Sequence, residues 1–178
     1  MINLNRLFSV KNISILLLIL FASCRSENSY EIKVYSSLEA LDKQKIELRI
    51  LDEDDALLVL SESTIRNGKA VLKGEIENPT LGELYIDLDR IPYIMPIVVE
   101  AGAIYAKLDS LTVLHGTDLN NRLHQMFLDK EDFLATVPDT IDVPGLRLEL
   151  LEFYRNELSK VEQDEVLSSY IKRQIENL

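Results

Sequence analysis

Apolar and polar residues alternate through much of the first two thirds of the chain. In short runs such as Ile46/Leu48/Ile50 and Leu84/Ile86/Leu88, every second residue is apolar. This spacing places the apolar side chains on one face of an extended segment and predicts half-buried strands. The runs with this spacing lie around residues 32–34, 46–50, 58–60, 72–76, 84–88 and 104–108.

Turn-forming residues separate these runs. Asn67-Gly68 is the sharpest turn signal, because both residues tolerate positive φ and suit a type I′ hairpin. Other turn signals stand at Asp52 to Asp55, Asn78-Pro79, Ala101-Gly102 and Asp109-Ser110. Short antiparallel strands at this spacing predict a β-sandwich or an open barrel.

One apolar stretch, residues 91–99, contains Pro92 and Pro96. Proline has no backbone N–H to donate to a neighbouring strand, which confines this stretch to a sheet edge or a bulge. We expect it to cover the barrel or to meet a partner.

The apolar period changes from two to 3.6 residues after Gly116, which predicts helices. Thr117 can cap a first helix, and Pro144 suits the first turn of a second one. A last amphipathic segment runs from Val166 to Leu178. The expected fold is therefore mainly β, an antiparallel sandwich or open barrel over residues 30–116, followed by two to three α-helices over residues 117–178.

The first 23 residues resemble a secretion signal. Arg6 and Lys11 form a positive start, residues 13–22 are apolar, and small residues precede Cys24, which is the single cysteine of the chain. Ten residues of helix span about 15 Å, against roughly 30 Å of hydrocarbon, so a permanent membrane span is the weaker interpretation. The pattern predicts a lipoprotein signal peptide at 1–23, lipid attachment at Cys24 and a tether at 24–29.

Charge excludes some partners. The whole chain has a net charge of -11, and without residues 1–23, which contain two basic and no acidic residues, it would have -13. So acidic a surface repels phosphate backbones, and we expect no nucleic-acid partner. It also disfavours docking on anionic lipid headgroups, so the lipid would have to hold the protein on the membrane. With Cys24 acylated, no thiol remains for a disulfide or a C-x-x-C redox pair.

Several stretches of the strand region are similar to one family. The longest is STIRNGKAVLKG at residues 63–74, and four more are LYID at 84–87, PIVVEAG at 96–102, LTVLHGT at 111–117 and NNRL at 120–123. Together they resemble an uncharacterised β domain that precedes thioredoxin-like thiol-disulfide oxidoreductase modules in lipoproteins of Bacteroidota. The resemblance covers about residues 30–134 and implies an envelope module carried beside a redox domain. Ala70 departs from the aromatic residue that relatives often have at its position.

Other chemistry has weaker signals. His115 and His124 would need carboxylates to form a metal site, and structural or surface histidines are the favoured alternative. Asp52 to Asp55 lack the glycine and distal glutamate of an EF-hand loop, so a solvated turn is favoured. Asp87 and Asp89 alternate onto one strand face, where a solvated pair is favoured over a hydrolase site.

Two tyrosines alternate with buried positions of the predicted strands. Tyr85 and Tyr105 are expected to point outward on neighbouring strands, where they would form a stacking platform or ordinary packing. No G-x-S-x-G elbow and no glycine-rich phosphate loop occurs in the sequence. We therefore expect no catalytic, cofactor-binding or metal-binding residue and no cofactor.

Two functions follow as hypotheses. The favoured one is a lipid-anchored, non-catalytic binding module of the cell envelope, whose partner is a redox protein, another envelope protein or a second copy. The alternative is an accessory domain of a thiol-disulfide oxidoreductase system that acts with a separate thioredoxin-like chain. Residues 25–28 contain one acidic residue. Because surface export signals in such bacteria are richer in acidic residues, we expect the outer membrane, facing the periplasm.

Overall fold

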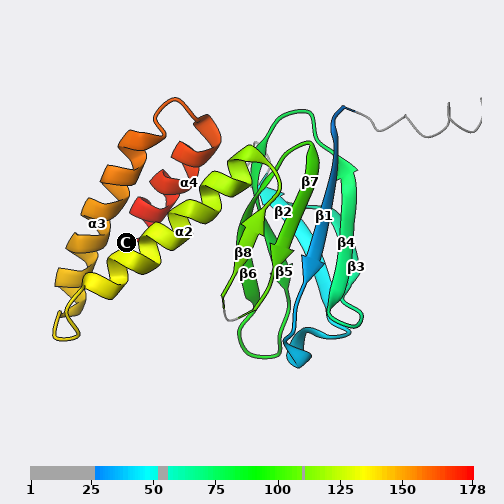
Figure 1. Cartoon of the computed structure of the whole chain (residues 1–178), viewed down its shortest axis with the longest axis horizontal. Helices are drawn as coiled ribbons and strands as arrows, with labels where there is room; N and C mark the ends of the chain where they lie inside the picture. Colours follow the sequence, from blue (N-terminus) through cyan, green and yellow to red (C-terminus); the bar gives the residue numbers. More distant parts are fainter. Residues whose placement is uncertain (1–26, 52–55, 110) are drawn as a thin grey trace, which may run out of the picture.

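The computed structural model describes residues 27–51, 56–109 and 111–178. Strands come first along the chain and helices follow (Figure 1). The strands are β1 (Ser29–Tyr35), β2 (Lys45–Leu51), β3 (Leu57–Thr64), β4 (Lys69–Glu75), β5 (Thr80–Ile86), β6 (Tyr93–Val99), β7 (Gly102–Lys107) and β8 (Val113–His115), with a short 3-10 helix η2 (Glu39–Leu41) after β1. The helices are α2 (Asp118–Thr136), α3 (Val143–Lys160) and α4 (Glu165–Glu176).

The strands form two four-stranded sheets that pack face to face. The first sheet has the order β4-β1-β7-β8, and the second has the order β3-β2-β5-β6. The expectation of a mainly β sandwich followed by helices is confirmed. One pairing departs from the antiparallel pattern, because β1 and β7 run parallel in the middle of the first sheet.

The core lies between the sheets and follows the alternation of the sequence. Ile32 and Val34 face Leu48 and Leu84 from opposite sheets, and all four are almost completely buried. Leu58 departs from the pattern and remains 46% exposed. A register shift opposite Leu48/Arg49 leaves Leu60 as the extra residue of β3. Such a bulge shifts the inward and outward positions of the edge strand β3 by one residue. The sequence pattern alone does not reveal the bulge.

The Asn67-Gly68 turn has positive φ at both residues, 51° and 69°, as the sequence predicts for a type I′ turn. The strands on its two sides belong to different sheets, β3 to the second and β4 to the first. Only Arg66 and Lys69 form a bridge directly beside the turn. The turn therefore closes one side of the sandwich as a corner between the sheets.

The opposite side of the sandwich ends at β6 and β8, where α2 contacts both strands. Residues 93–99 of the stretch 91–99 form the edge strand β6, as its prolines predict. The backbone N–H and carbonyl of Val98 point away from β5 and bond with the Asn120 side chain of α2, at 3.0 and 2.7 Å. Pro96, two residues earlier on the strand, points its nitrogen the same way and needs no partner there. Pro96 and Asn120 together leave this part of the β6 edge without a free backbone N–H that could pair with another strand.

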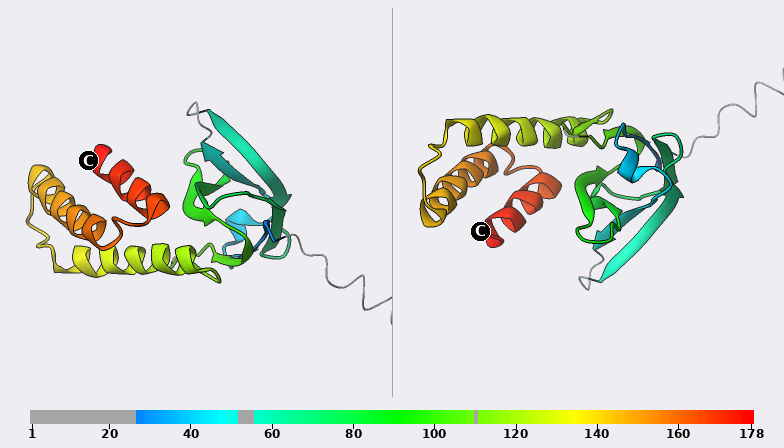
Figure 2. Two further views of the ribbon diagram at one scale, coloured as in Figure 1. Left: turned by 90° about the horizontal axis from the view of Figure 1, so that it is seen from above. Right: turned by 90° about the horizontal axis from the view of Figure 1, so that it is seen from below.

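The helices form a layer beside the sandwich (Figure 2). From β8, α2 runs outward, α3 returns beside it, and α4 packs on α3 and contacts β5 of the second sheet. Thr117 is the N-cap residue of α2, but its hydroxyl accepts a hydrogen bond from Asn120 at 2.8 Å instead of capping a backbone N–H. No helix in the described residues is both long and apolar enough to cross a membrane.

Candidate functional site

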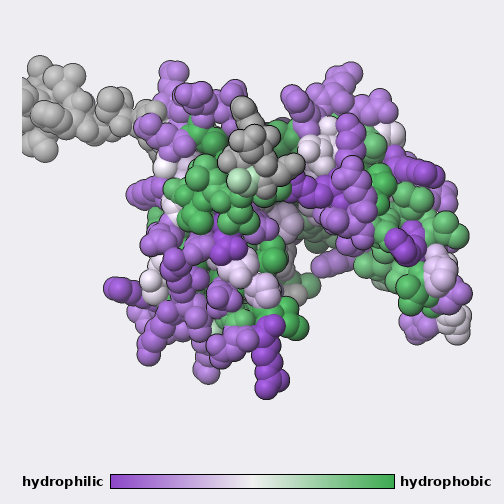
Figure 3. Space-filling view, turned by 180° about the vertical axis from the view of Figure 1, so that it is seen from behind, coloured by the Kyte–Doolittle hydropathy of each residue, from purple (hydrophilic) through white to green (hydrophobic). Residues whose placement is uncertain are grey.

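A groove separates the outer face of the second sheet from α4. We use "the groove" for this recess, which has a volume of about 250 Å³. Figure 3 shows the hollow between the sandwich and the helical layer, with apolar side chains gathered on both. Its apolar lining is Ile50, Leu51, Leu57, Leu81, Ile94 and Pro96 from the sheet and Tyr170 from α4.

Strand register places this lining in one row across the sheet. Arg49 of β2 pairs with Glu83 of β5, which in turn pairs with Pro96 of β6. Because side chains of directly paired residues lie on the same sheet face, all three point away from the core, into or beside the groove. Ile94, two residues before Pro96, shares this face and is 51% exposed. The outer face of the second sheet thus presents apolar surface that the helical layer leaves partly open.

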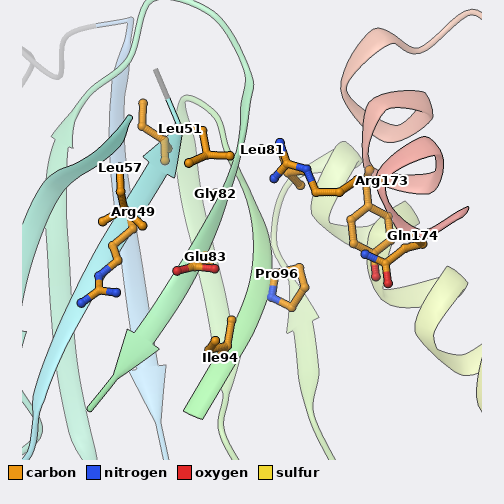
Figure 4. A pocket seen from close by; sticks show the side chains of 12 residues that line it. Arg49, Leu51, Leu57, Leu81, Gly82, Glu83, Ile94, Pro96, Arg173 and Gln174 are labelled. Carbon is orange, nitrogen blue, oxygen red and sulfur yellow. The ribbon is translucent and has the colours of Figure 1, made fainter. Parts of the chain in front are cut away.

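Arg49 is held at the sheet end of the groove by two neighbours. Its guanidinium carbon lies 3.2 Å from the ring centroid of Tyr85, and its Nε donates to Glu47 at 2.7 Å. A hydrogen bond from Lys45, supported by the one from Arg49, lowers the pKa of Glu47 below its ordinary value. These contacts fix the Arg49 side chain away from α4, as Figure 4 shows.

Arg173 forms the cationic end of the groove on the side of α4. Its side chain reaches from the helix toward Leu81 and Gly82 (Figure 4). It makes no ion pair with any carboxylate in the described ranges, whereas Arg49 pairs with Glu47 and Arg122 pairs with Asp118 and Asp164. Among the residues that the structure describes, the charged side chains that line the groove are two arginines, Arg49 and Arg173, and one glutamate, Glu83.

α4 owes its position to contacts at its start and its middle. The Asp164 side chain caps the helix by accepting from the backbone N–H of Leu167 at 3.0 Å, and it also accepts from Arg122 of α2 at 2.7 Å. Tyr170 packs edge-on against Phe127 of α2, with ring centroids 6.3 Å apart, and burial raises the pKa of its hydroxyl. These contacts hold the wall of the groove that carries Arg173.

The structure separates the two tyrosines of the expected stacking platform. Tyr85 lies on β5 of the second sheet, and Tyr105 lies on β7 of the first. Each ring already has a neighbour: Arg49 stacks on Tyr85, and His115 stacks on Tyr105 at 5.0 Å between centroids. The expectation of neighbouring strands was wrong, because the chain passes from the second sheet to the first between β6 and β7.

The candidate metal and carboxylate sites do not assemble among the described residues. No group of three or more His, Cys, Asp or Glu side chains there is placed to hold a metal ion. Asp87 and Asp89 follow the end of β5 and are exposed. The expectation that they share a strand face was wrong, because neither residue lies in a strand. Cys24 and the Asp52 to Asp55 turn lie outside the described residues.

His124 is a half-buried histidine on α2 whose Nδ1 has no hydrogen-bond partner among the described residues. Burial, helped by the neighbouring charge of His115, lowers its pKa below the ordinary value. The unfolded chain then binds more protons than the folded one, so the free energy of unfolding should decline slightly as the pH falls from 7 through the unfolded pKa. Urea unfolding at pH 7 and pH 5 checks this, and His124→Gln should weaken the decline. If the free energy of unfolding of His124→Gln declines as much as that of the wild type, titratable groups other than His124 cause the decline.

Comparison with known proteins gives no family. Neither a family model nor a curated protein matches the chain. Among solved structures, a crystal structure of (S)-allantoin synthase aligns with a TM-score of 0.35 and 8% sequence identity, over 57% of this chain and 48% of that chain. The chain thus spans about half the length of that protein, and a likeness of this size carries no argument about function.

Sequence reasoning did not find the groove or Arg173. The lining comes from four strands and one helix that lie far apart in the sequence, and Arg173 is one of several charged residues on an amphipathic helix. Only the exposed apolar residues of stretch 91–99 gave a signal, since an apolar edge strand predicts a contact surface.

Proposed function

We propose that this chain is a lipid-anchored, non-catalytic binding module of the cell envelope and that the groove is its binding surface. The observation that carries the proposal is the groove itself, a partly open apolar recess on an otherwise acidic protein. Ligand sites in proteins are typically concave and apolar, with a few polar groups that fix orientation.

The chemistry of the groove supports binding over catalysis. The part of its lining that the structure describes has two arginines and one glutamate but no serine, cysteine or histidine, so these residues lack the nucleophile and base of covalent catalysis. General acid-base catalysis by Glu83 would need a second group poised to exchange a proton, and arginine does not titrate near neutral pH. Apolar contact and charge are what this lining offers.

The anchor rests on the sequence around Cys24. Lipid attachment requires the sulfur, so Cys24→Ala should lose nearly all membrane retention, because no other membrane-binding feature is expected in so acidic a chain. Membrane and supernatant fractions after a carbonate wash measure this. Ser26→Ala, a change of similar size two residues away, serves as the control and should stay in the membrane fraction. Retention of Cys24→Ala after the wash, or a free thiol in the mass of the mature N-terminus, would contradict the proposal.

A further inference from the structure

We infer that the groove binds a small amphiphile with one carboxylate and a short unbranched apolar tail, such as a medium-chain fatty acid. This inference rests on the proposed function, because it takes the groove to be a binding surface. It adds the chemical class of the ligand. Three observations support it: the size of the groove, its apolar lining and, at one end, the Arg173 guanidinium, which has no ion pair within residues 27–51, 56–109 and 111–178.

Size limits the ligand. Sites for drug-sized ligands usually occupy about 300–1,000 Å³. The groove has about 250 Å³, and it is partly open along the sheet. An elongated tail of several methylene groups fits this space, whereas a folded peptide segment would extend well beyond it. The lining of Leu, Ile and Pro side chains offers such a tail contact without a hydrogen-bond partner.

Charge selects the head group. Arg173 points into the groove and has no ion pair among the described residues. A guanidinium presents parallel N–H donors that match the two oxygens of a carboxylate. Glu83 lies beside Arg49 in the strand register, so the acidic part of the lining is at the sheet. A ligand with its head at Arg173 and its tail along Leu81, Leu51 and Leu57 stays on the side of Glu83 away from Ile94, so its tail does not cross that carboxylate.

Octanoate titration of the full chain, held in lipid nanodiscs with empty nanodiscs as the blank, tests the inference. Calorimetry measures affinity, and methyl NMR resonances of Leu57, Leu81 and Ile94 report the place of binding. We expect shifts confined to the groove, no binding of acetate, and about a three- to four-fold gain in affinity for each methylene that the lining still covers. Octanol, which has the same tail and no charge, should bind about five-fold more weakly, the upper range for an exposed ion pair.

Matched variants separate the head from the tail. Arg173→Gln should reduce octanoate affinity about five-fold and leave octanol affinity unchanged, whereas Lys172→Gln, its exposed neighbour on α4, should change neither. Leu57→Trp, at a 53% exposed position of the lining, should obstruct the groove and weaken both ligands. Leu148→Trp, at a 68% exposed position on α3, is the control for added aromatic surface.

Three results would overturn the inference: equal affinities for octanoate and octanol, no effect of Arg173→Gln, or methyl shifts outside the groove. These are distinct from failure of the proposed function. If octanoate does not bind while membrane retention still depends on Cys24, the ligand class is wrong and the anchored module stands. If retention does not depend on Cys24 but octanoate binds as expected, the anchor is wrong and the ligand site stands.

Discussion

Replacing Asn120 with leucine should lower the free energy of unfolding by about 3 kcal/mol, because each buried polar group left without a partner costs about 1–3 kcal/mol. Asn120 is fully buried, and its side chain serves both the N–H and the carbonyl of Val98. Leucine fills a similar volume but satisfies neither group. Urea unfolding followed by circular dichroism measures the loss.

The neighbouring residue provides a matched control. Asn121 is exposed, and its side chain accepts one hydrogen bond, from the backbone N–H of Gly116 at 3.1 Å. Asn121→Leu should therefore cost less than about 1 kcal/mol. Equal losses in the two variants would show that the edge of β6 does not depend on Asn120.

An aspartate at this position gives a second test if the leucine variant does not fold. Asn120→Asp keeps an acceptor for the Val98 N–H but places a carboxylate beside the Val98 carbonyl and near Glu100. These oxygens favour the protonated acid, so the folded-state pKa should rise above the unfolded value. The folded protein then binds more protons, and stability should increase as the pH falls from 7 toward 5. A stability that falls over this range by as much as in the wild type would contradict the role assigned to Asn120.

The second large effect is expected at Gly74. An added Cβ there would lie 2.4 Å from the Tyr30 hydroxyl oxygen and within 2.9 Å of two ring carbons. Tyr30 pairs directly with Gly74 across β1 and β4 and lies over it as a buried ring. Gly74→Ala should therefore cost about 2–3 kcal/mol, as overpacking of a core does. Thermal or urea unfolding measures this loss.

A double-mutant cycle identifies the cause of that loss. Tyr30→Leu shortens the side chain and should itself destabilise the sandwich, since it removes the ring and its hydrogen bond to Ser61. In that background, Gly74→Ala should cost less than about 1 kcal/mol, because the clashing atoms are gone. Additive losses would mean that glycine is needed at this position for a reason other than the tyrosine.

Local patterns predicted the parts of the fold that depend on neighbouring residues. Two-residue alternation placed Ile32, Val34 and Leu84 in the core, and the paired positive φ values of Asn67-Gly68 followed from turn chemistry. Pro144 in the first turn of α3 followed from its missing N–H. In each case the deciding interaction lies within a few residues of the sequence signal.

Features set by distant residues were not predictable in this way. Whether β1 pairs with β4, β7 or both depends on how the two sheets divide the strands, and alternation is the same for either outcome. The role of Asn120 depends on Val98, which lies 22 positions away in the sequence. The groove needs β2, β3, β5, β6 and α4 together, so no single stretch of sequence contains its pattern.

The division of strands between the sheets has a consequence for how the chain reaches this structure. Neither sheet is built from a contiguous segment, since β1 must await β4 and β7, while β2 and β3 must await β5 and β6. Such distant pairings delay the rate-limiting step, so folding should take milliseconds to seconds, as in other β-rich topologies. A fragment that stops before β7 would leave β1 without its parallel neighbour, and the sandwich should therefore form in one all-or-none event.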